Sequence, residues 1–311
     1  MQGLLGLENL TRDELLDLLD AADRFVLDGR PHTPPQFRGA LDGAAVALAF
    51  FEPSTRTRAS FELAVQRLGG HPLVFDSTAS SIRKGETEVD TCLNLQAMGV
   101  RGFIVRHADR HVPLRIADAL AAPVINAGNG SGEHPTQGLL DALTIRHALR
   151  RRDLDGVRVA ILGDIVHSRV ARSDVYGLST LGASVIVAGP APLMPTSRKG
   201  WNAEFAESRA DAVRDADIVI MLRIQHERID GGGVPSDSYV RDWGVDETVV
   251  STQMRPDVFI MHPGPVIRGV ELTSGVADGP RSLVLQQTGF GVAVRQAVLM
   301  KLLVPEAIAT T

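Results

Sequence analysis

The sequence predicts an α/β protein of two domains, each a mostly parallel sheet flanked by helices, and three observations support this. Its 311 residues are about twice the length of a typical domain. Short apolar runs alternate with segments that carry apolar residues at helical spacing. This alternation occurs in two successive series, which the charged stretch 150–153 separates. Such series are typical of parallel sheets covered by helices.

The first series begins with a helix that we expect over 11–26, because Thr11 and Glu14 have the spacing of a capping box. Proline and glycine then break the pattern over 29–35. The further elements that we expect are strands over 44–51, 73–75, 102–106 and 123–126, helices over 54–68, 86–98, 111–120 and 135–149, and a glycine-rich loop over 128–132.

The second series repeats the arrangement after residue 150. Val175, Leu178 and Leu181 lie at helical spacing between two apolar runs. The elements that we expect are strands over 157–162, 184–188, 217–222 and 258–261 and a long final helix over 286–303.

Composition excludes several classes of protein. The formal charge of −5 argues against a general nucleic-acid binder, which needs an excess of Lys and Arg. Cys92 is the single cysteine, so an internal disulfide or a cysteine-based zinc site is not possible. The longest apolar stretch, 43–51, is about half of the ~20 residues that a membrane helix needs, and the first residues lack a basic signal region. We expect a soluble, cytoplasmic protein with neither membrane nor nucleic-acid partners.

The most informative residues follow the strand over 44–51. The run from Ser54 to Arg58 places three hydroxyl groups and two guanidinium groups at the start of a helix. Free backbone N–H groups at a helix start favour an anion, and arginine suits phosphate. The alternative is a Ser/Thr helix cap followed by solvated arginines. The nucleotide-binding glycine motifs are missing, and Gly289-Phe290-Gly291 opens no strand–turn–helix unit, so we expect the phosphate of a small molecule.

Other polar groups follow further strands, where ligands of parallel sheets bind. Arg106 ends the strand over 102–106, and we interpret the neighbouring His107 as a bystander. In the second series, two arginines after strands are suited to a dicarboxylate, although surface ion pairing is the simpler alternative. The remaining candidates are Ser81 and Lys84 in a basic loop, His134 and Gln137 after the glycine-rich loop, Arg169, Arg223, and the segment that contains Pro263 and Gly264.

These motifs together resemble one family, the aspartate/ornithine carbamoyltransferases, over about 11–303. The run from Phe51 to Arg58 is similar to the carbamoyl-phosphate signature, and the run from His134 to Gln137 is similar to the second signature. The run from Ser81 to Glu86 matches the mobile loop. The run from Arg223 to Arg228 is similar to the aspartate-binding motif, and the His-Cys-Leu-Pro of ornithine enzymes is absent. Ile267 departs from the family pattern, because an Asn is expected there.

The resemblance implies transfer of a carbamoyl group from carbamoyl phosphate to L-aspartate, in pyrimidine biosynthesis, without a metal or organic cofactor. It implies a carbamoyl-phosphate-binding domain over 1–150, joined by the C-terminal helix 286–311, and an aspartate-binding domain over 151–285. It also implies a homotrimer, because Ser81 and Lys84 come from a neighbouring subunit. The residues implied for carbamoyl phosphate are Ser54, Thr55, Arg56, Thr57, Ser81, Arg106, His134, Gln137, Pro263 and Gly264. Those implied for aspartate are Lys84, Arg169, Arg223 and Gln225, and the catalytic residues among both sets are Thr57, Lys84, Arg106 and His134.

Two alternatives stay open at this stage. The chain could be a non-catalytic scaffold for another pyrimidine enzyme, or a carbamoyltransferase for another amino acid. The sequence also leaves open whether a dihydroorotase, a dihydroorotase-like protein or a regulatory chain binds to it.

Overall fold

The computed structural model describes residues 3–76, 86–224 and 236–309. The chain divides into two compact units, of which unit 1 comprises Met1–Leu143 with Gly289–Thr311 and unit 2 comprises Thr144–Thr288. The α/β class predicted from the alternating pattern is confirmed in each of them. The end of the chain belongs to unit 1, because the second boundary between the units falls within the last long helix.

The elements of unit 1 include one short 3₁₀ turn, η1. They are β1 (Gly3–Leu4), α1 (Arg12–Asp23), β2 (Val26–Leu27), β3 (Arg30–Pro31), η1 (Pro35–Phe37), β4 (Ala45–Phe50), α2 (Thr55–Arg67), β5 (His71–Asp76), α3 (Glu88–Ala97), β6 (Gly102–His107), α4 (Val112–Ala119), β7 (Val124–Asn129), the part of α5 (Pro135–Leu149) up to Leu143, the part of α11 (Val284–Leu303) from Gly289 and α12 (Pro305–Ala309).

The elements of unit 2 also include one 3₁₀ turn, η4. They are β8 (Arg158–Leu162), α6 (Arg169–Thr180), β9 (Ser184–Ala188), η4 (Ala191–Leu193), β10 (Glu204–Phe205), α7 (Arg209–Val213), β11 (Ile218–Met221), α8 (Ser236–Trp243), α9 (Glu247–Gln253), β12 (Phe259–Met261) and α10 (Ser274–Ala277).

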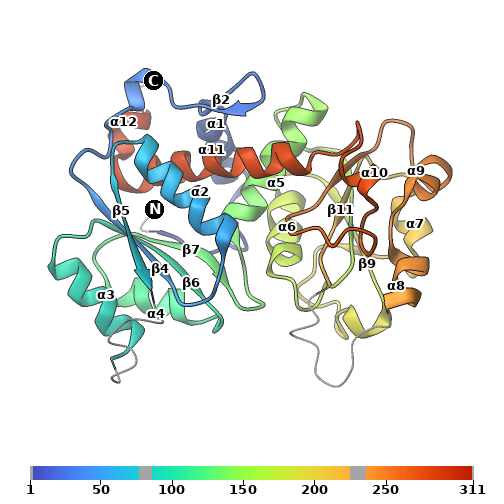
Figure 1. Cartoon of the computed structure of the whole chain (residues 1–311), viewed down its shortest axis with the longest axis horizontal. Helices are drawn as coiled ribbons and strands as arrows, with labels where there is room; N and C mark the ends of the chain where they lie inside the picture. The colour runs from blue at the N-terminus through green and yellow to red at the C-terminus, as the bar shows by residue number, and fades with distance from the viewer. Residues whose placement is uncertain (1–2, 77–85, 225–235, 310–311) are drawn as a thin grey trace. The chain divides into compact units, whose positions relative to one another are not determined.

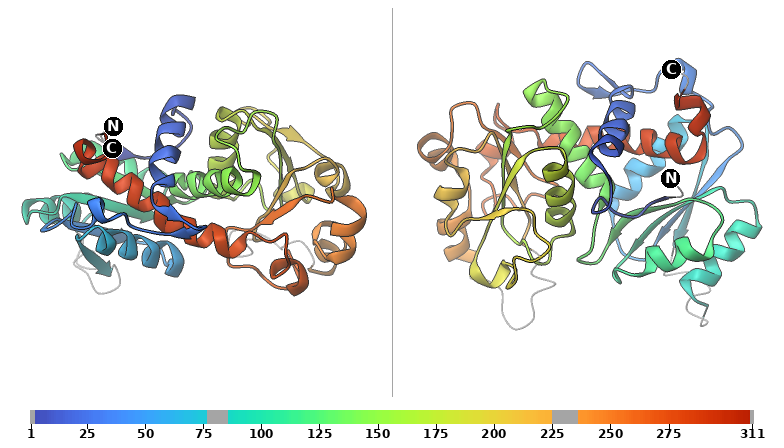
Figure 2. Two further views of the ribbon diagram at one scale, coloured as in Figure 1. Left: turned by 90° about the horizontal axis from the view of Figure 1, so that it is seen from above. Right: turned by 180° about the vertical axis from the view of Figure 1, so that it is seen from behind.

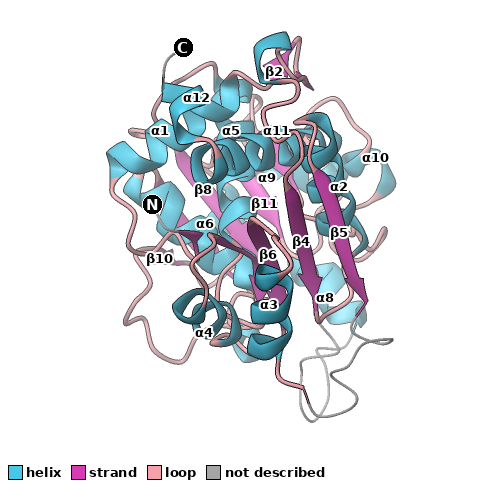
Figure 3. Cartoon of the chain, turned by 90° about the vertical axis from the view of Figure 1, so that its left-hand side faces the viewer, coloured by secondary structure: helices cyan, strands magenta, loops and turns pink. Residues whose placement is uncertain are grey.

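The sheet of unit 1 is parallel throughout its described strands, in the order β1-β7-β6-β4-β5. Strands β4 and β5 run side by side in the same direction (Figure 3). Helices α3 and α4 cover one face, where Cys92 and Ile116 pack against Ala47 and Phe103, and α2 lies on the other face (Figure 1). Both faces are covered, which explains why β4 is apolar at successive positions. The carboxyl ends of β4, β6 and β7 meet at one edge.

The sheet of unit 2 has the order β10-β9-β8-β11-β12 and is also parallel among its described strands. Helix α6 covers one face, and α7 and α9 cover the other (Figure 2). Ala212 and Val249 from these last helices are buried against Leu162 and Met221 of the sheet. The carboxyl ends of β8, β11 and β12 lie next to one another, because these three strands are neighbours.

Some elements differ from the predicted ones. The predicted helix over 11–26 ends at Asp23, because Val26 and Leu27 pair with β3 in an antiparallel hairpin. The predicted loop over 128–132 is wrong at its start, since β7 continues to Asn129. Thr11 and Glu14 do form the predicted capping box. None of the helices in the described ranges combines the length and apolar character that spanning a bilayer requires.

Candidate active site

Within the described residues, the first turn of α2 has neither a side-chain cap nor an acidic residue. Ser54 holds the N-cap position with an extended backbone (φ −162°), and within the described ranges its side chain makes no capping hydrogen bond. The first turn of this helix contains no acidic residue. Thr55 and Arg56 are exposed, whereas Ser54 and Thr57 are half-buried. The N–H groups of the first turn, together with these side chains, can therefore receive an anion.

Arg106 stands beside this turn because it ends β6, where it is the register partner of Phe50 at the end of β4. Its side chain is buried. Nη1 donates to the carbonyl oxygen of Ala127 at 3.2 Å, and Nη2 lies 3.4 Å from Oε1 of Glu52. The guanidinium group is thus fixed between the ends of three neighbouring strands. Sequence reasoning missed Glu52, whose carboxylate offsets the charge of Arg106.

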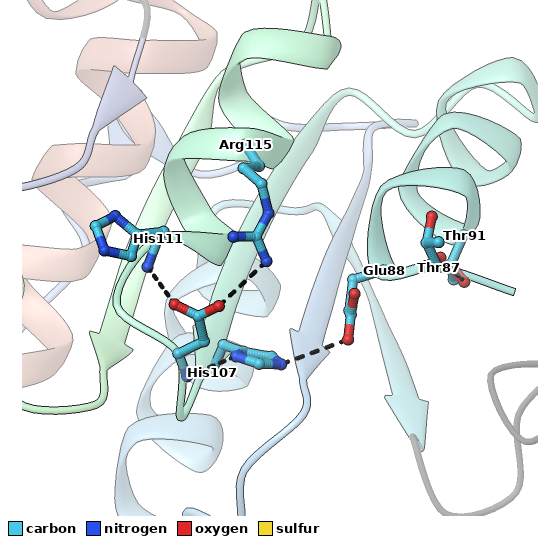
Figure 4. A network of polar contacts seen from close by, with 7 residues as sticks. Thr87, Glu88, Thr91, His107, His111 and Arg115 are labelled. Carbon is cyan, nitrogen blue, oxygen red and sulfur yellow. Dashed lines mark hydrogen bonds and ion pairs between the residues drawn. The ribbon is translucent and has the colours of Figure 1, made fainter. Parts of the chain in front are cut away.

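His107 belongs to a separate polar network at the same strand end (Figure 4). Its Nδ1 accepts from the backbone N–H of Asp109 at 2.8 Å, so Nε2 carries the proton of the neutral ring. That nitrogen lies 3.5 Å from Oε1 of Glu88. Asp109 in turn accepts from the backbone N–H of His111 at 2.8 Å and from Arg115 at 3.2 Å. The network anchors the end of β6, which supports the position of Arg106.

His134 lies in the loop between β7 and α5, and its side chain is buried. Its Nε2 lies 3.4 Å from Oγ1 of Thr57 in the first turn of α2. The structure therefore brings together two residues that are 77 positions apart and were both predicted for the same oxygen. A hydroxyl and an imidazole can each donate to a developing oxyanion.

Gln137 lies in the first turn of α5, where its backbone N–H donates to the carbonyl oxygen of His134 at 2.8 Å. Its side-chain Nε2 donates to both carboxylate oxygens of Asp141, each at 3.1 Å. This contact orients the side-chain amide, with Nε2 directed at Asp141. Oε1 of Gln137 is the atom left to accept an N–H group. Sequence reasoning missed Asp141, although Gln and Asp four residues apart on a helix are a known hydrogen-bonding pair.

The unit 2 candidates follow three neighbouring strands. Arg169 is the first residue of α6 and is buried, after a start capped by Ser168, which accepts from the N–H of Ala171 at 3.1 Å. Arg223 follows β11 and is half-buried. Pro263 and Gly264 follow β12. Neighbouring strand ends thus carry both predicted arginines, as a site for a dicarboxylate requires.

Glu271 connects two of these loops and was missed by sequence reasoning. It is fully buried, and its carboxylate accepts from the backbone N–H of Ile224 at 3.3 Å and of Ile267 at 2.7 Å. Burial raises the pKa of this carboxyl group, and the backbone hydrogen bonds from Ile267 and Ile224, followed by the Arg223 charge, oppose the shift. The side chain of Ile267 departs from the family pattern, but this contact with Glu271 uses only its backbone N–H. No sequence pattern predicts a contact between residues 224 and 271.

An open cavity of about 410 Å³ in unit 2 lies away from these groups. Arg209, Arg241 and Asp246 are among its lining residues, and none of the predicted site residues lines it. Arg209 donates to the carbonyl oxygens of Arg241 and Gly244. The candidate residues lie at the strand ends and not around this cavity.

Three predicted residues, Ser81, Lys84 and Gln225, lie outside the described residues. Across the ranges that are described, no group of three or more His, Cys, Asp or Glu side chains is placed to hold a metal ion.

Two parallel α/β units with basic side chains at the ends of their strands have the features of an enzyme that binds small anions. Residues 2–147 match the family model "Aspartate/ornithine carbamoyltransferase, carbamoyl-P binding domain", and residues 155–302 match "Aspartate/ornithine carbamoyltransferase, Asp/Orn binding domain". The chain belongs to this carbamoyltransferase family, which confirms the resemblance found in the sequence.

Individual relatives extend over nearly the whole chain. An aspartate carbamoyltransferase catalytic subunit of Xanthomonas campestris pv. campestris is 49% identical over 309 residues, which cover 97% of this chain and 96% of that protein. The ornithine carbamoyltransferase of Pyrococcus furiosus has a TM-score of 0.85 at 30% identity, with 97% of both chains covered. The aspartate transcarbamoylase of Trypanosoma cruzi in complex with carbamoyl phosphate has a TM-score of 0.80 at 29% identity, with 97% and 96% covered. Backbone similarity alone does not separate the aspartate from the ornithine enzymes.

Proposed function

We propose that this chain transfers the carbamoyl group of carbamoyl phosphate to the amine of L-aspartate, which gives N-carbamoyl-L-aspartate and phosphate for pyrimidine biosynthesis. The contact between Thr57 and His134 at the open start of α2 carries the proposal, because it puts two oxyanion donors beside a turn suited to phosphate. The choice of aspartate is supported by the relative that is 49% identical and by the two arginines of unit 2.

Each predicted residue has a role that its chemistry suits. Arg56 and the hydroxyl groups near it bind the phosphate. Thr57, Arg106 and His134 donate to the carbamoyl oxygen. Oε1 of Gln137 accepts from the carbamoyl amide, as do the carbonyl oxygens of Pro263 and Gly264. The complete sets are Ser54, Thr55, Arg56, Thr57, Ser81 and Arg106 for phosphate, and Lys84, Arg169, Arg223 and Gln225 for aspartate.

The reaction then needs charge stabilisation and positioning. The aspartate amine attacks the carbamoyl carbon, a C–N bond forms, and negative charge builds on the carbonyl oxygen. Preorganised donors such as Thr57 and His134 contribute about 3–4 kcal/mol each in comparable oxyanion sites. The C–O bond to phosphate then breaks, and the departing phosphate accepts the proton that the amine loses. Holding the two substrates in place contributes a further ~7–11 kcal/mol.

The test is an assay of the purified chain with carbamoyl phosphate and either aspartate or ornithine. We expect carbamoyl-aspartate, with kcat/KM for aspartate at least ~100-fold above that for ornithine, because a site built for a second carboxylate leaves buried charge unpaired with ornithine. A preference for ornithine would overturn the acceptor. An absence of product with either amino acid would favour the scaffold alternative.

We further propose a homotrimer with shared active sites. Strand β5 forms an edge of the sheet of unit 1, and Leu73 and Val74 on it are 43% and 44% exposed. Met98, which follows α3, is 79% exposed. Apolar side chains on an edge strand support contact with another chain. Leu73 and Val74 lie on the strand that directly precedes the segment with Ser81 and Lys84, which the family resemblance assigns to a neighbouring subunit.

Mixed trimers test this sharing of sites. Arg56→Ala and Lys84→Ala chains should each be inactive alone, because each lacks one part of every site. A mixture refolded together should regain part of the wild-type turnover, since some sites then receive Arg56 from one chain and Lys84 from another. Turnover that stays at the level of the separate variants, in trimers shown to be mixed by mass spectrometry, would contradict shared sites.

A cytoplasmic location is also part of the proposal. Cys92 is the single cysteine of the chain and is buried, which suits a reducing compartment. Fractionation of the source cells, with carbamoyl-aspartate formation as the readout, tests this location.

A further inference from the structure

The first residues of the chain are bound to the loop that carries His134. The carboxylate of Glu133 accepts from the backbone N–H of Leu7 at 2.7 Å and from the backbone N–H of Glu8 at 3.3 Å. Glu133 is only 9% exposed, and Leu7 is fully buried. A carboxylate removed from water is costly unless hydrogen bonds compensate it. These two N–H groups therefore take the place of water around the Glu133 carboxylate.

The backbone of Glu133 is bonded as well. Its N–H donates to Oδ1 of Asn129 at 2.6 Å, and its carbonyl oxygen accepts from the N–H of Asn129 at 3.2 Å and from Nδ2 of Asn126 at 3.3 Å. Nδ2 of Asn126 also donates to the carbonyl oxygen of Leu5 at 2.9 Å. Asn126 and Glu133 thus connect the loop to the N-terminal segment 5–8 at two separate points.

Gly6 lies against the Glu133 carboxylate in the middle of this segment. It follows β1, whose parallel pairing with β7 brings the segment beside the loop. A Cβ atom at position 6 would collide with Oε1 of Glu133. A free side chain could move away from such a methyl group, but this one is held by two N–H groups. Glycine at position 6 therefore allows the close approach of backbone and carboxylate.

The bonds of Glu133 fix the chain directly before His134. On its other side, His134 is followed by α5, which begins at Pro135. Between these two supports, Nε2 of His134 lies 3.4 Å from Oγ1 of Thr57. A donor to an oxyanion is effective only when it is held in advance at the place where the charge develops. The contacts of the N-terminal segment thus bear on the geometry of the candidate site.

We propose that Glu133 is a positioning residue for carbamoyl transfer. By binding the N-terminal segment 5–8, it holds His134 beside Thr57, where both can donate to the carbamoyl oxygen. Glu133 itself does not touch substrate in this role. The inference rests on the proposed function, because it deepens the role given to His134.

The first test compares turnover with phosphate binding in Glu133→Ala. We expect kcat to fall by ~10- to 100-fold, because small displacements of a catalytic group have effects of this size. The Kd for inorganic phosphate, from calorimetric titration, should stay at the wild-type value, since the start of α2 is unchanged. Glu133→Gln keeps one acceptor oxygen and should lower kcat less, and it is the variant to use if Glu133→Ala does not fold. Equal losses of turnover and phosphate binding would mean a merely structural role and would overturn the inference.

Gly6→Ala disturbs the same contact from the other side. Its methyl group displaces the carboxylate, so kcat should fall while phosphate binding is kept. In Gly6→Ala/Glu133→Ala the collision is absent, so kcat should equal that of Glu133→Ala alone. The control is Gly289→Ala, whose Cβ would meet Pro31 at an ordinary contact distance of 3.4 Å and should leave kcat unchanged. Losses that multiply in the double variant would contradict a shared contact.

A measurement without turnover separates this inference from the proposed function. In protein labelled with ¹³Cε1-histidine, the His134 signal, assigned by its loss in His134→Gln, should shift or broaden in Glu133→Ala and in Gly6→Ala. The His107 signal should not change, because this ring belongs to the separate network at the end of β6. If wild type makes no carbamoyl-aspartate, the proposed function fails while the His134 signal still judges the positioning. An unchanged His134 signal together with unchanged kcat in Glu133→Ala would overturn the inference.

Discussion

Helices α1 and α2 begin in opposite ways. At the start of α1, Oγ1 of Thr11 accepts from the N–H of Glu14 at 3.3 Å, and the Glu14 carboxylate accepts from the N–H of Thr11 at 2.8 Å. The first turn also carries Asp13, which complements the helix dipole. At the start of α2, Ser54 makes no capping bond within the described residues, and the first turn carries Arg56 without any acid. The backbone N–H groups at the start of α1 are therefore bonded by its own side chains, whereas those at the start of α2 can bind an external anion.

The largest expected effect is at the open start. Arg56→Ala should lower kcat/KM by ~100- to 1,000-fold or more, because it removes a charged donor from the phosphate of the substrate. The free energy of unfolding should change little, since the side chain is exposed. Steady-state kinetics and urea unfolding measure the two quantities, and calorimetric titration with inorganic phosphate measures binding without turnover.

Arg58 provides the matched control two residues later. Its side chain is 52% exposed and forms an ion pair with Glu62 at 3.3 Å on the same helix. Such surface pairs contribute little to stability, and the family resemblance gives Arg58 no contact with substrate. Arg58→Ala should therefore keep activity within about threefold, an effect below ~1 kcal/mol. Equal losses in both variants would mean that general positive charge, and not the start of α2, binds the phosphate.

A smaller effect compares the two N-cap residues directly. Thr11→Ala should lower the free energy of unfolding by about 1 kcal/mol and leave activity unchanged. Ser54→Ala should have a smaller effect on stability, because no capping bond is lost, yet lower kcat/KM by ~10-fold through the loss of a donor to phosphate. Urea unfolding and kinetics on both variants check this reciprocal pattern. The contrast between the helix starts would be wrong if Ser54→Ala lost stability while keeping full activity.

Much of the fold could be predicted because its strands are apolar and its helices periodic. The strand over 184–188 was predicted with its observed bounds. β1 was missed because a two-residue edge strand carries no periodic pattern. The β2–β3 hairpin was read as a break, although Asp28-Gly29 is a strong hairpin signal and both residues have positive φ, at 50° and 70°.

The candidate site could be predicted only where its residues are close in sequence. The runs that contain Ser54 and His134 are local, and their resemblance to family signatures was visible. Asp141 could have been found as the helical partner of Gln137. Glu271 could not, because its role comes from burial and from contacts with residues far away in the chain. The sequence therefore predicted the side chains that can contact a ligand, and the fold showed which other residues hold those side chains in place.

The smallest expected effect concerns the acid that completes the start of α1. The backbone N–H of Thr11, and then its hydroxyl, hold the pKa of Glu14 below the ordinary value of 4.5. A carboxyl group whose pKa is lowered by folding stabilises the protein above its unfolded-state pKa, and this contribution is lost as the pH falls through the folded-state pKa. Glu14→Gln retains a side chain that can complete the capping box but does not titrate. Urea unfolding should therefore show wild type more stable than Glu14→Gln at neutral pH, with the difference shrinking below about pH 4. At the start of α2 no side chain supplies this anion in the described structure. Added inorganic phosphate should therefore increase the free energy of unfolding of the wild-type protein. No such increase with phosphate would contradict the difference between the starts of α1 and α2.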